Sequence, residues 1–209
     1  MTKFFDEKTP SQIVERPTLT GLLKATIDSA ASQIKVCVPA KVIKYDSKTQ
    51  VLDAQPVFKR KQKDGTVTDS PIIYSIPVAF PRAGDAFVHL PIKAGNSVLL
   101  LFSDNSLEKW LTSGELNEPE DTRKHHIADA IAIPGGYPFT QAAPVENGND
   151  IIVKNKDTEM RIRTDGKMQI LNQNHEMLKV IDEYMTRALA GDHWGATRAR
   201  NKFKSFVKS

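Results

Sequence analysis

Two apolar runs are separated by prolines and glycines in the stretch IPVAFPRAGDAFVHLPIKAGNSVLLLFS, residues 76–103. In residues 85–92 the side chains of Ala86, Val88 and Leu90 repeat with a period of two, which predicts a strand with one buried face. The second run, residues 98–102, is apolar throughout, and its short length favours a fully buried strand over a helix. We therefore expect these two runs to form a hairpin in a small barrel.

The residues that follow this hairpin predict a short helix. Asp104 begins a group of polar residues that can cap it, and Leu107, Trp110 and Leu111 then occur at helical spacing. Gly114 provides a stop. Strands combined with one short helix are typical of a five-stranded OB-like barrel.

The residues before the hairpin supply the other strands of this barrel. Apolar residues alternate from Ile34 to Tyr45, and a change of phase at Val42 and Ile43 predicts a β-bulge. Residues 34–63 therefore predict a long curved hairpin that turns at residues 46–49, and residues 72–80 predict a third strand. The two runs of residues 85–102 complete five strands. The fold class is mainly β.

Five segments are expected along the chain. Residues 1–17 form an extended arm, residues 18–33 an amphipathic helix, and residues 34–140 the OB-fold domain. Residues 141–172 hold a linker and a short β segment, and residues 173–209 hold a C-terminal helix and a basic tail. The apolar stripe of the first helix predicts packing either on the barrel or on a neighbouring subunit, and the sequence leaves both open.

An eight-residue repeat follows the linker. Ile152, Met160 and Met168 lie eight residues apart, and Lys154, Ile162 and Ile170 follow the same spacing. One strand and one turn in every eight residues is typical of a β-prism or β-helix, although a plain hairpin gives the same alternation. So short a β segment cannot bury its apolar side chains alone, and it requires partners.

The C-terminal helix predicts self-association as well. In residues 174–190 the side chains of Leu178, Ile181 and Met185 follow the three- and four-residue steps of a coiled-coil seam, and Gly191 ends the helix. A helix of this length is marginal in isolation. It packs either against copies of itself or back on the barrel.

The positive charge of the chain lies near its C-terminus. The net charge is +4, and the basic residues after residue 191 exceed the single acid there by the same amount. The rest of the chain is close to neutral, which weakens the case for a basic nucleic-acid surface on the barrel.

No motif in the sequence predicts catalysis or a cofactor. Five histidines lack metal-ligand spacing, and neither a Gly-x-Ser-x-Gly motif nor a phosphate-binding loop is present. The single cysteine, Cys37, falls in an apolar alternation and is expected to be a buried strand residue. The sequence also lacks a membrane-spanning run and a signal-peptide core, so we expect a soluble protein that is not an enzyme, with no metal, cofactor or catalytic residue.

Several segments together resemble one protein family. Residues 38–56, 76–82, 90–103 and 123–135 are similar, in order, to the N-terminal OB domain of central spike proteins in contractile-tail bacteriophage baseplates. The resemblance covers about residues 19–140. It implies a homotrimer in the virion tail baseplate, made in the host cytoplasm, whose OB domains form a collar joined to a hub protein. The β-helix that follows would point toward the host outer membrane or envelope.

This resemblance gives the repeat and the seam a role in trimer contacts. The expected interface residues are Ile152, Met160, Ile162, Met168, Ile170, Leu178, Ile181 and Met185. Only about two octads are present and no His-x-His apex follows them, which indicates a short spike or a hub–spike adapter with a possible separate tip protein. The alternative is an OB-fold protein that binds single-stranded nucleic acid. The spike interpretation expects no nucleic-acid partner.

Overall fold

The structure is a computed structural model that describes residues 18–62, 64–145 and 147–207 of the 209-residue chain. The expected arm of residues 1–17 lies outside these residues. The chain divides into an N-terminal unit, Met1–Ala142, and a C-terminal unit, Ala143–Ser209.

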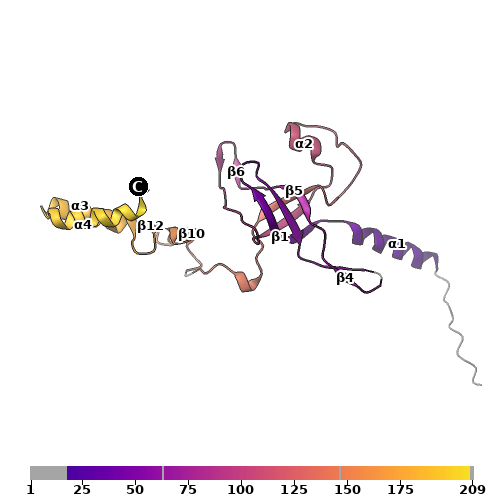
Figure 1. Cartoon of the computed structure of the whole chain (residues 1–209), viewed down its shortest axis with the longest axis horizontal. Coiled ribbons are helices and arrows are strands. Elements are labelled where there is room, and N and C mark those ends of the chain that lie inside the picture. Colours follow the sequence, from indigo (N-terminus) through magenta and orange to yellow (C-terminus); the bar gives the residue numbers. More distant parts are fainter. Residues whose placement is uncertain (1–17, 63, 146, 208–209) are drawn as a thin grey trace, which may run out of the picture. The chain divides into compact units, whose positions relative to one another are not determined.

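A curled, five-stranded antiparallel half-barrel forms the centre of the N-terminal unit (Figure 1). Its strand order is β5-β2-β1-β8-β9. The strands are β1 (Cys37–Asp46), β2 (Val51–Pro56), β5 (Ile73–Pro77), β8 (Ser97–Phe102) and β9 (Ala130–Pro134). A parallel bridge joins Val78 to Ala132, and the Ala79 amide donates to the Ala132 carbonyl at 2.9 Å. This bridge brings the two edges of the sheet together.

The core of the half-barrel comes from one face of each strand. Its largest fully buried apolar side chains are Val42, Leu52, Ile76, Val98 and Leu100. Burying a side chain of this kind stabilises the fold by about 1.5–3 kcal/mol. The predicted bulge is confirmed, because the pairing of β1 with β2 shifts register between Val42 and Lys44.

Residues 85–92 do not form a strand of the sheet, so that expectation was wrong. Instead β6 (Arg82–Ala83) and β7 (Ala86–Phe87) form a separate small hairpin, in which Phe87 is 62% exposed. Pro81 and Pro91 bracket this segment, and proline cannot donate to a strand ladder. The fifth strand is β9, whose Ala130 and Ala132 enter the core beside β8. A second small hairpin, β3 (Arg60–Lys61) with β4 (Val67–Thr68), extends from the same unit.

Cys37 is exposed, which contradicts the expected buried position. Side chains alternate between the two faces of a strand. Ala40 and Val42 of β1 occupy the buried face, so Cys37 belongs to the other face.

Both predicted helices of the N-terminal unit are present, but α2 begins after Leu107 without the side-chain cap that was expected from the polar residues beginning at Asp104. Helix α1 (Leu19–Gln33) is capped by Thr18, whose hydroxyl accepts from the Gly21 amide at 3.1 Å. Helix α2 (Glu108–Ser113) ends at Gly114, which has a φ of 70°. The apolar stripe of α1 is exposed, so the single chain does not bury it against the sheet.

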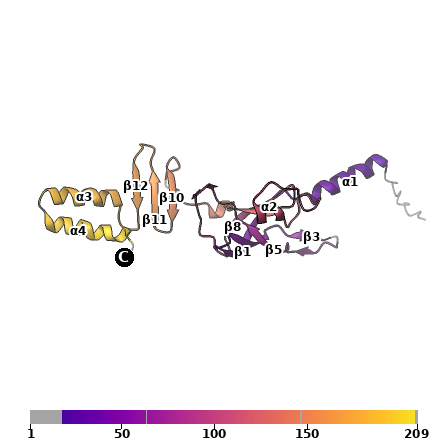
Figure 2. The same cartoon turned by 90° about the horizontal axis from the view of Figure 1, so that it is seen from above.

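The C-terminal unit combines a three-stranded antiparallel sheet with a helical hairpin (Figure 2). The sheet follows chain order, with β10 (Ile151–Asn155), β11 (Thr158–Ile162) and β12 (Met168–Leu171). Helices α3 (Met177–Leu189) and α4 (His193–Phe203) pack side by side, and the basic segment expected as a tail therefore begins with a helix. Short 3-10 helices cover Phe139–Gln141 in the N-terminal unit and Lys204–Phe206 in the C-terminal unit. The octads thus form a meander within this one chain, and an intertwined β-helix remains a prediction.

Candidate interaction surfaces

The sheet of the C-terminal unit has one strongly apolar face. Val153 pairs with Met160, which in turn pairs with Ile170, and the next positions pair Ile151 with Ile162 and Ile162 with Met168. We call this set the apolar sheet face, and it consists of Ile151, Val153, Met160, Ile162, Met168 and Ile170. Its five most exposed members retain 38–66% of their accessible surface in the single chain. Within the described part of the chain, no segment covers this contiguous apolar surface.

The predicted interface residues of the strands divide between the two faces. Met160, Ile162, Met168 and Ile170 lie together on the apolar sheet face, whereas Ile152 pairs with Arg161 on the other face. A two-residue turn joins β10 to β11, so the residue numbers of paired positions sum to an odd number. The odd-numbered side chains of β10 therefore share a face with the even-numbered side chains of β11. Counting in eights cannot detect that change between odd and even numbers, and for this reason it missed Ile151 and Val153.

The opposite face of the sheet carries charged side chains that pair within the chain. The buried Glu159 carboxylate accepts from Arg161 Nε at 2.8 Å and pairs with Lys154 Nζ at 3.2 Å. The hydrogen bond from Arg161, followed by that from Lys154, lowers the pKa of Glu159 below its ordinary value. Charges on this face are thus satisfied within the chain, in contrast to the apolar sheet face.

The predicted seam of α3 is also left open. Leu178 and Met185 are exposed and Ile181 is half-buried. Helix α4 covers a different side of α3, where Val180 is buried, and contributes its own buried Ala196 and Ala199. The pairing of α3 with α4 therefore leaves Leu178 and Met185 free for another contact, whereas Ile181 lines a groove beside Phe203 of α4.

Ion pairs and a helix cap hold α3 and α4 together. Glu183 accepts from Lys202 Nζ at 2.8 Å and from Arg187 Nε at 3.2 Å. Asp192 accepts from Arg187 Nη1 at 3.0 Å and from the Gly195 amide at 2.8 Å, which caps α4. The pKa of Glu183 is lowered mainly by Lys202, and that of Asp192 mainly by the Gly195 amide. Both carboxylates are therefore stabilised in their charged form.

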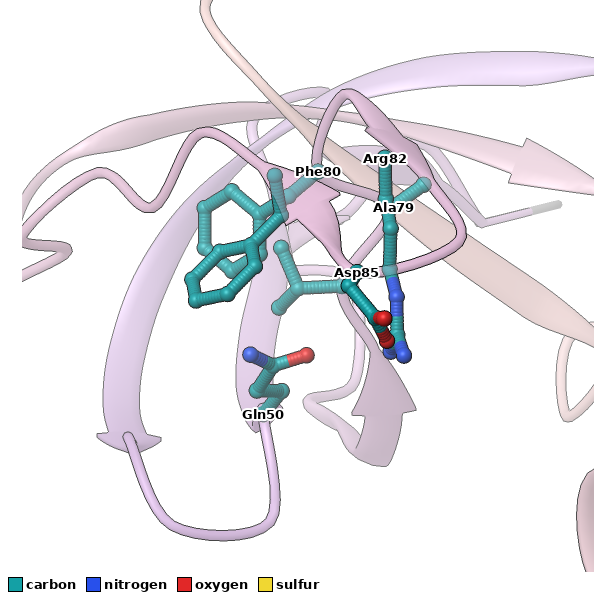
Figure 3. Close-up of a pocket in the computed structure, with 7 residues that line it drawn as sticks. Gln50, Ala79, Phe80, Arg82 and Asp85 are labelled. Carbon is teal, nitrogen blue, oxygen red and sulfur yellow. The ribbon is translucent and has the colours of Figure 1, made fainter.

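A pocket of about 330 Å³ lies in the N-terminal unit next to the β6–β7 hairpin (Figure 3). The side chains of Arg82 and Asp85 end near each other at one side of it, and the rim also includes Gln50 and Phe80. The guanidinium, carboxylate and carboxamide can exchange hydrogen bonds with a polar group. Together with the exposed Phe87 they make this hairpin a second candidate contact surface.

Across residues 18–62, 64–145 and 147–207, no group of three His, Cys, Asp or Glu side chains is placed to hold a metal ion. The helices within these same ranges include none with the length and hydropathy needed to cross a bilayer.

Comparison with known proteins relates the N-terminal unit to a phage protein. Residues 38–135 match the family described as the phage protein Gp138 N-terminal domain. No curated protein matches the chain. The matched residues begin within β1 and end just after β9, so they include all of the half-barrel except the first residue of β1. The half-barrel of this chain is thus similar to the N-terminal domain of phage protein Gp138, which supports a structural protein of a phage virion.

Proposed function

We propose that the chain is the trimeric central spike, or a hub–spike adapter, of a contractile phage tail baseplate. In this role it assists penetration of the host envelope mechanically and without catalytic turnover. The observation that carries the proposal is the apolar sheet face, which the single chain leaves exposed.

An exposed apolar face of this kind favours self-association. A contiguous apolar patch on a monomer commonly marks an interface, and a three-stranded sheet gains stability only when its apolar face is buried. Homo-oligomers usually close with rotational symmetry, so equivalent residues of three copies can meet around a threefold axis. Three copies around one axis would bury Met160, Ile162 and Met168 inside and leave the charged Glu159 and Arg161 face outside.

The α3 seam extends the same argument along the chain. Leu178 and Met185 lie away from α4 and are exposed, as a helix–helix contact between copies requires. In this proposal the three α3 helices pack around the threefold axis, while α4 lies on the outer side of each. After β12 the chain continues into α3 and α4 instead of another octad, and the proposal includes a short spike that seats a separate tip protein.

The N-terminal unit fits the role of a collar that is joined to a baseplate hub. Its strand order, together with the parallel bridge from Val78 to Ala132, is that of a partly open OB barrel. The match to the Gp138 N-terminal domain covers this same region. In the proposed assembly the exposed stripe of α1 and the hairpin around Phe87 contact neighbouring copies or the hub.

Electron microscopy of virions that contain the chain tests the proposed location. Gold-labelled antibodies raised against residues 143–207 should bind at the distal end of the tail. Labelling on the capsid, or along the tail shaft alone, would contradict the proposal. A control antibody against the major capsid protein shows that the particles are accessible to label.

A further inference from the structure

Another pocket of about 330 Å³ lies in the N-terminal unit, beside the first residues of β1 and the last residues of β2. We call it the β1–β2 pocket. Its apolar lining includes the largely buried Phe102 and the half-buried Val38 and Ile127. Phe58 also lines it and is 64% exposed. An apolar pocket with an exposed aromatic side chain can accommodate a side chain from another molecule.

Three basic side chains line the same pocket, and no acidic residue of the described chain is among its lining residues. The three are Lys35, Lys59 and Arg60, and all are exposed. Lys59 pairs with Asp69 at 3.2 Å, whereas Lys35 and Arg60 form no ion pair with any residue that the structure describes. The β1–β2 pocket therefore combines an apolar interior with an excess of positive charge at its rim.

The loop that follows α2 has the complementary composition. Leu116 is fully exposed in the single chain, and three exposed carboxylates lie within four residues of it, those of Glu115, Glu118 and Glu120. In the described ranges of the chain, no basic side chain pairs with these three carboxylates. The amide of Asn117 donates to the Glu115 carbonyl at 2.8 Å and gives the loop a local turn. We call residues 115–120 the acidic loop.

We propose that the acidic loop of one copy binds the β1–β2 pocket of a second copy. Leu116 enters the pocket, and the carboxylates beside it face Lys35 and Arg60. Burial of the apolar side chain supplies attraction, while opposite charges at the rim fix the orientation and disfavour wrong partners.

This contact joins two different surfaces, so it is heterologous and forms a ring when the rotation between copies closes. A closed ring of three N-terminal units is the collar that the proposed spike requires. In this respect the inference rests on the proposed function, and it names the residues that hold the collar together.

The occupant of the pocket comes from another copy, since the acidic loop does not occupy the pocket of its own chain. Figure 1 shows α2 and the β3–β4 hairpin, which begins at the pocket with Arg60, on different sides of the half-barrel. Phe139 is as exposed as Leu116, but residues 134–142 carry no charge. Phe139 therefore does not match the basic rim.

Cys37 makes the contact measurable, because it is the single cysteine of the chain and it lines the β1–β2 pocket. In the full-length Leu116→Cys chain, a short bismaleimide should join Cys37 of one copy to the substituted position of the next. The product should be a covalent trimer on a denaturing gel, and peptide mapping should find the link between these two positions. The native chain has one thiol and cannot be linked beyond a dimer. The control Phe139→Cys adds an equally exposed thiol to the same unit and should yield far less trimer.

Charge reversal tests whether the two surfaces recognise each other. Two double variants of the Leu116→Cys chain reverse one surface each: Glu118→Lys with Glu120→Lys, and Lys35→Glu with Arg60→Glu. Each should lower the rate of linking roughly tenfold, because like charges then face one another across the contact. The quadruple variant reverses both surfaces and should restore the rate.

The outcomes separate this inference from the proposed function. Linking of Leu116→Cys that does not exceed that of Phe139→Cys would overturn the inference, even if the native chain is a trimer in solution. A quadruple variant that links no faster than the double variants would also overturn it. A linked trimer in a virion whose tail end is not labelled by the antibodies would support the contact and contradict the proposed location. Oligonucleotide binding that is lost in the Lys35→Glu, Arg60→Glu variant, without linking between copies, would assign the pocket to nucleic acid instead.

Discussion

Arg123 donates two hydrogen bonds to the carboxylate of Asp129, from Nε to Oδ2 at 2.6 Å and from Nη2 to Oδ1 at 3.0 Å. Asp129 is only 1% exposed, and it also accepts from the Leu107 amide at 2.9 Å. Because Leu107 precedes α2 and Asp129 precedes β9, one carboxylate connects the helix to the last strand of the half-barrel. The hydrogen bonds from Arg123 are the main reason that the pKa of Asp129 is lowered.

Removing this carboxylate should destabilise the N-terminal unit. The substitution Asp129→Ala leaves the Leu107 amide and the Arg123 guanidinium without their acceptor, and we expect a loss of about 2 kcal/mol in the free energy of unfolding. Urea unfolding can be followed through Trp110 on α2 in a Trp194→Phe background. Asp121→Ala is the control, since Asp121 also pairs with Arg123 but is largely exposed, and it should cost less than about 1 kcal/mol. Equal losses in the two variants would contradict a special role for Asp129.

The same carboxylate predicts how stability depends on pH. Its pKa is lower in the folded than in the unfolded chain, so its contribution is complete above the ordinary value of about 3.9 and is lost as the pH falls through the lowered value. The difference in stability between the native chain and Asp129→Ala should therefore be constant near neutral pH and shrink below about pH 4. Urea midpoints measured across this range check the prediction. A difference that grows toward acidic pH would have the wrong sign.

A side chain at Gly195 should disturb the N-terminal cap of α4. A Cβ there would overlap Asp192 Oδ2 and lie 2.6 Å from Arg187 Nη1, the two groups that form the cap and the ion pair. Gly195→Ala should lower the stability of the C-terminal unit by more than about 1 kcal/mol, despite the better helix propensity of alanine. Thermal unfolding monitored by Trp194 fluorescence in a Trp110→Phe background measures it. Gly148→Ala is the control in the same unit, because a Cβ there meets no atom within 4 Å, and its unfolding should be unchanged.

A charge on the apolar sheet face should prevent self-association. Met160→Lys places an ammonium group where the proposed trimer buries apolar side chains, and we expect association to weaken by more than about 100-fold because an unpaired buried charge is costly. Sedimentation velocity gives the distribution of species. Asp157→Asn adds the same unit of charge in the exposed β10–β11 turn and should leave the distribution unchanged. If Met160→Lys sediments as the native chain does, the apolar sheet face is not the interface.

Most of the half-barrel could be predicted from local patterns. The continuous apolar run of β8 and the alternation along β1 reflect burial directly, and the phase change at Val42 located the bulge. The stretch of residues 85–92 shows the same alternation, yet it lies outside the sheet because Pro81 and Pro91 limit its pairing. Strand β9 is separated from its partner β8 by the α2 region, and pairing over such a distance leaves no local signal.

The candidate interface was predicted only in part, for a related reason. The seam residues Leu178 and Met185 lie on one open face of α3, as helical spacing implies. In the sheet, the side-chain face depends on the length of each turn, and the turn between β10 and β11 placed Ile152 opposite to Met160. The folding of residues 193–203 into a helix on α3 depends on the small residues Ala196 and Ala199 and on the cap at Asp192.

The mass of the full-length chain in solution tests the central claim most directly. Sedimentation equilibrium at neutral pH should give about 70 kDa, three times the 23.3 kDa of one chain. The native chain should keep this mass as it is diluted through the micromolar range. A mass of 23.3 kDa under these conditions would contradict the trimeric spike.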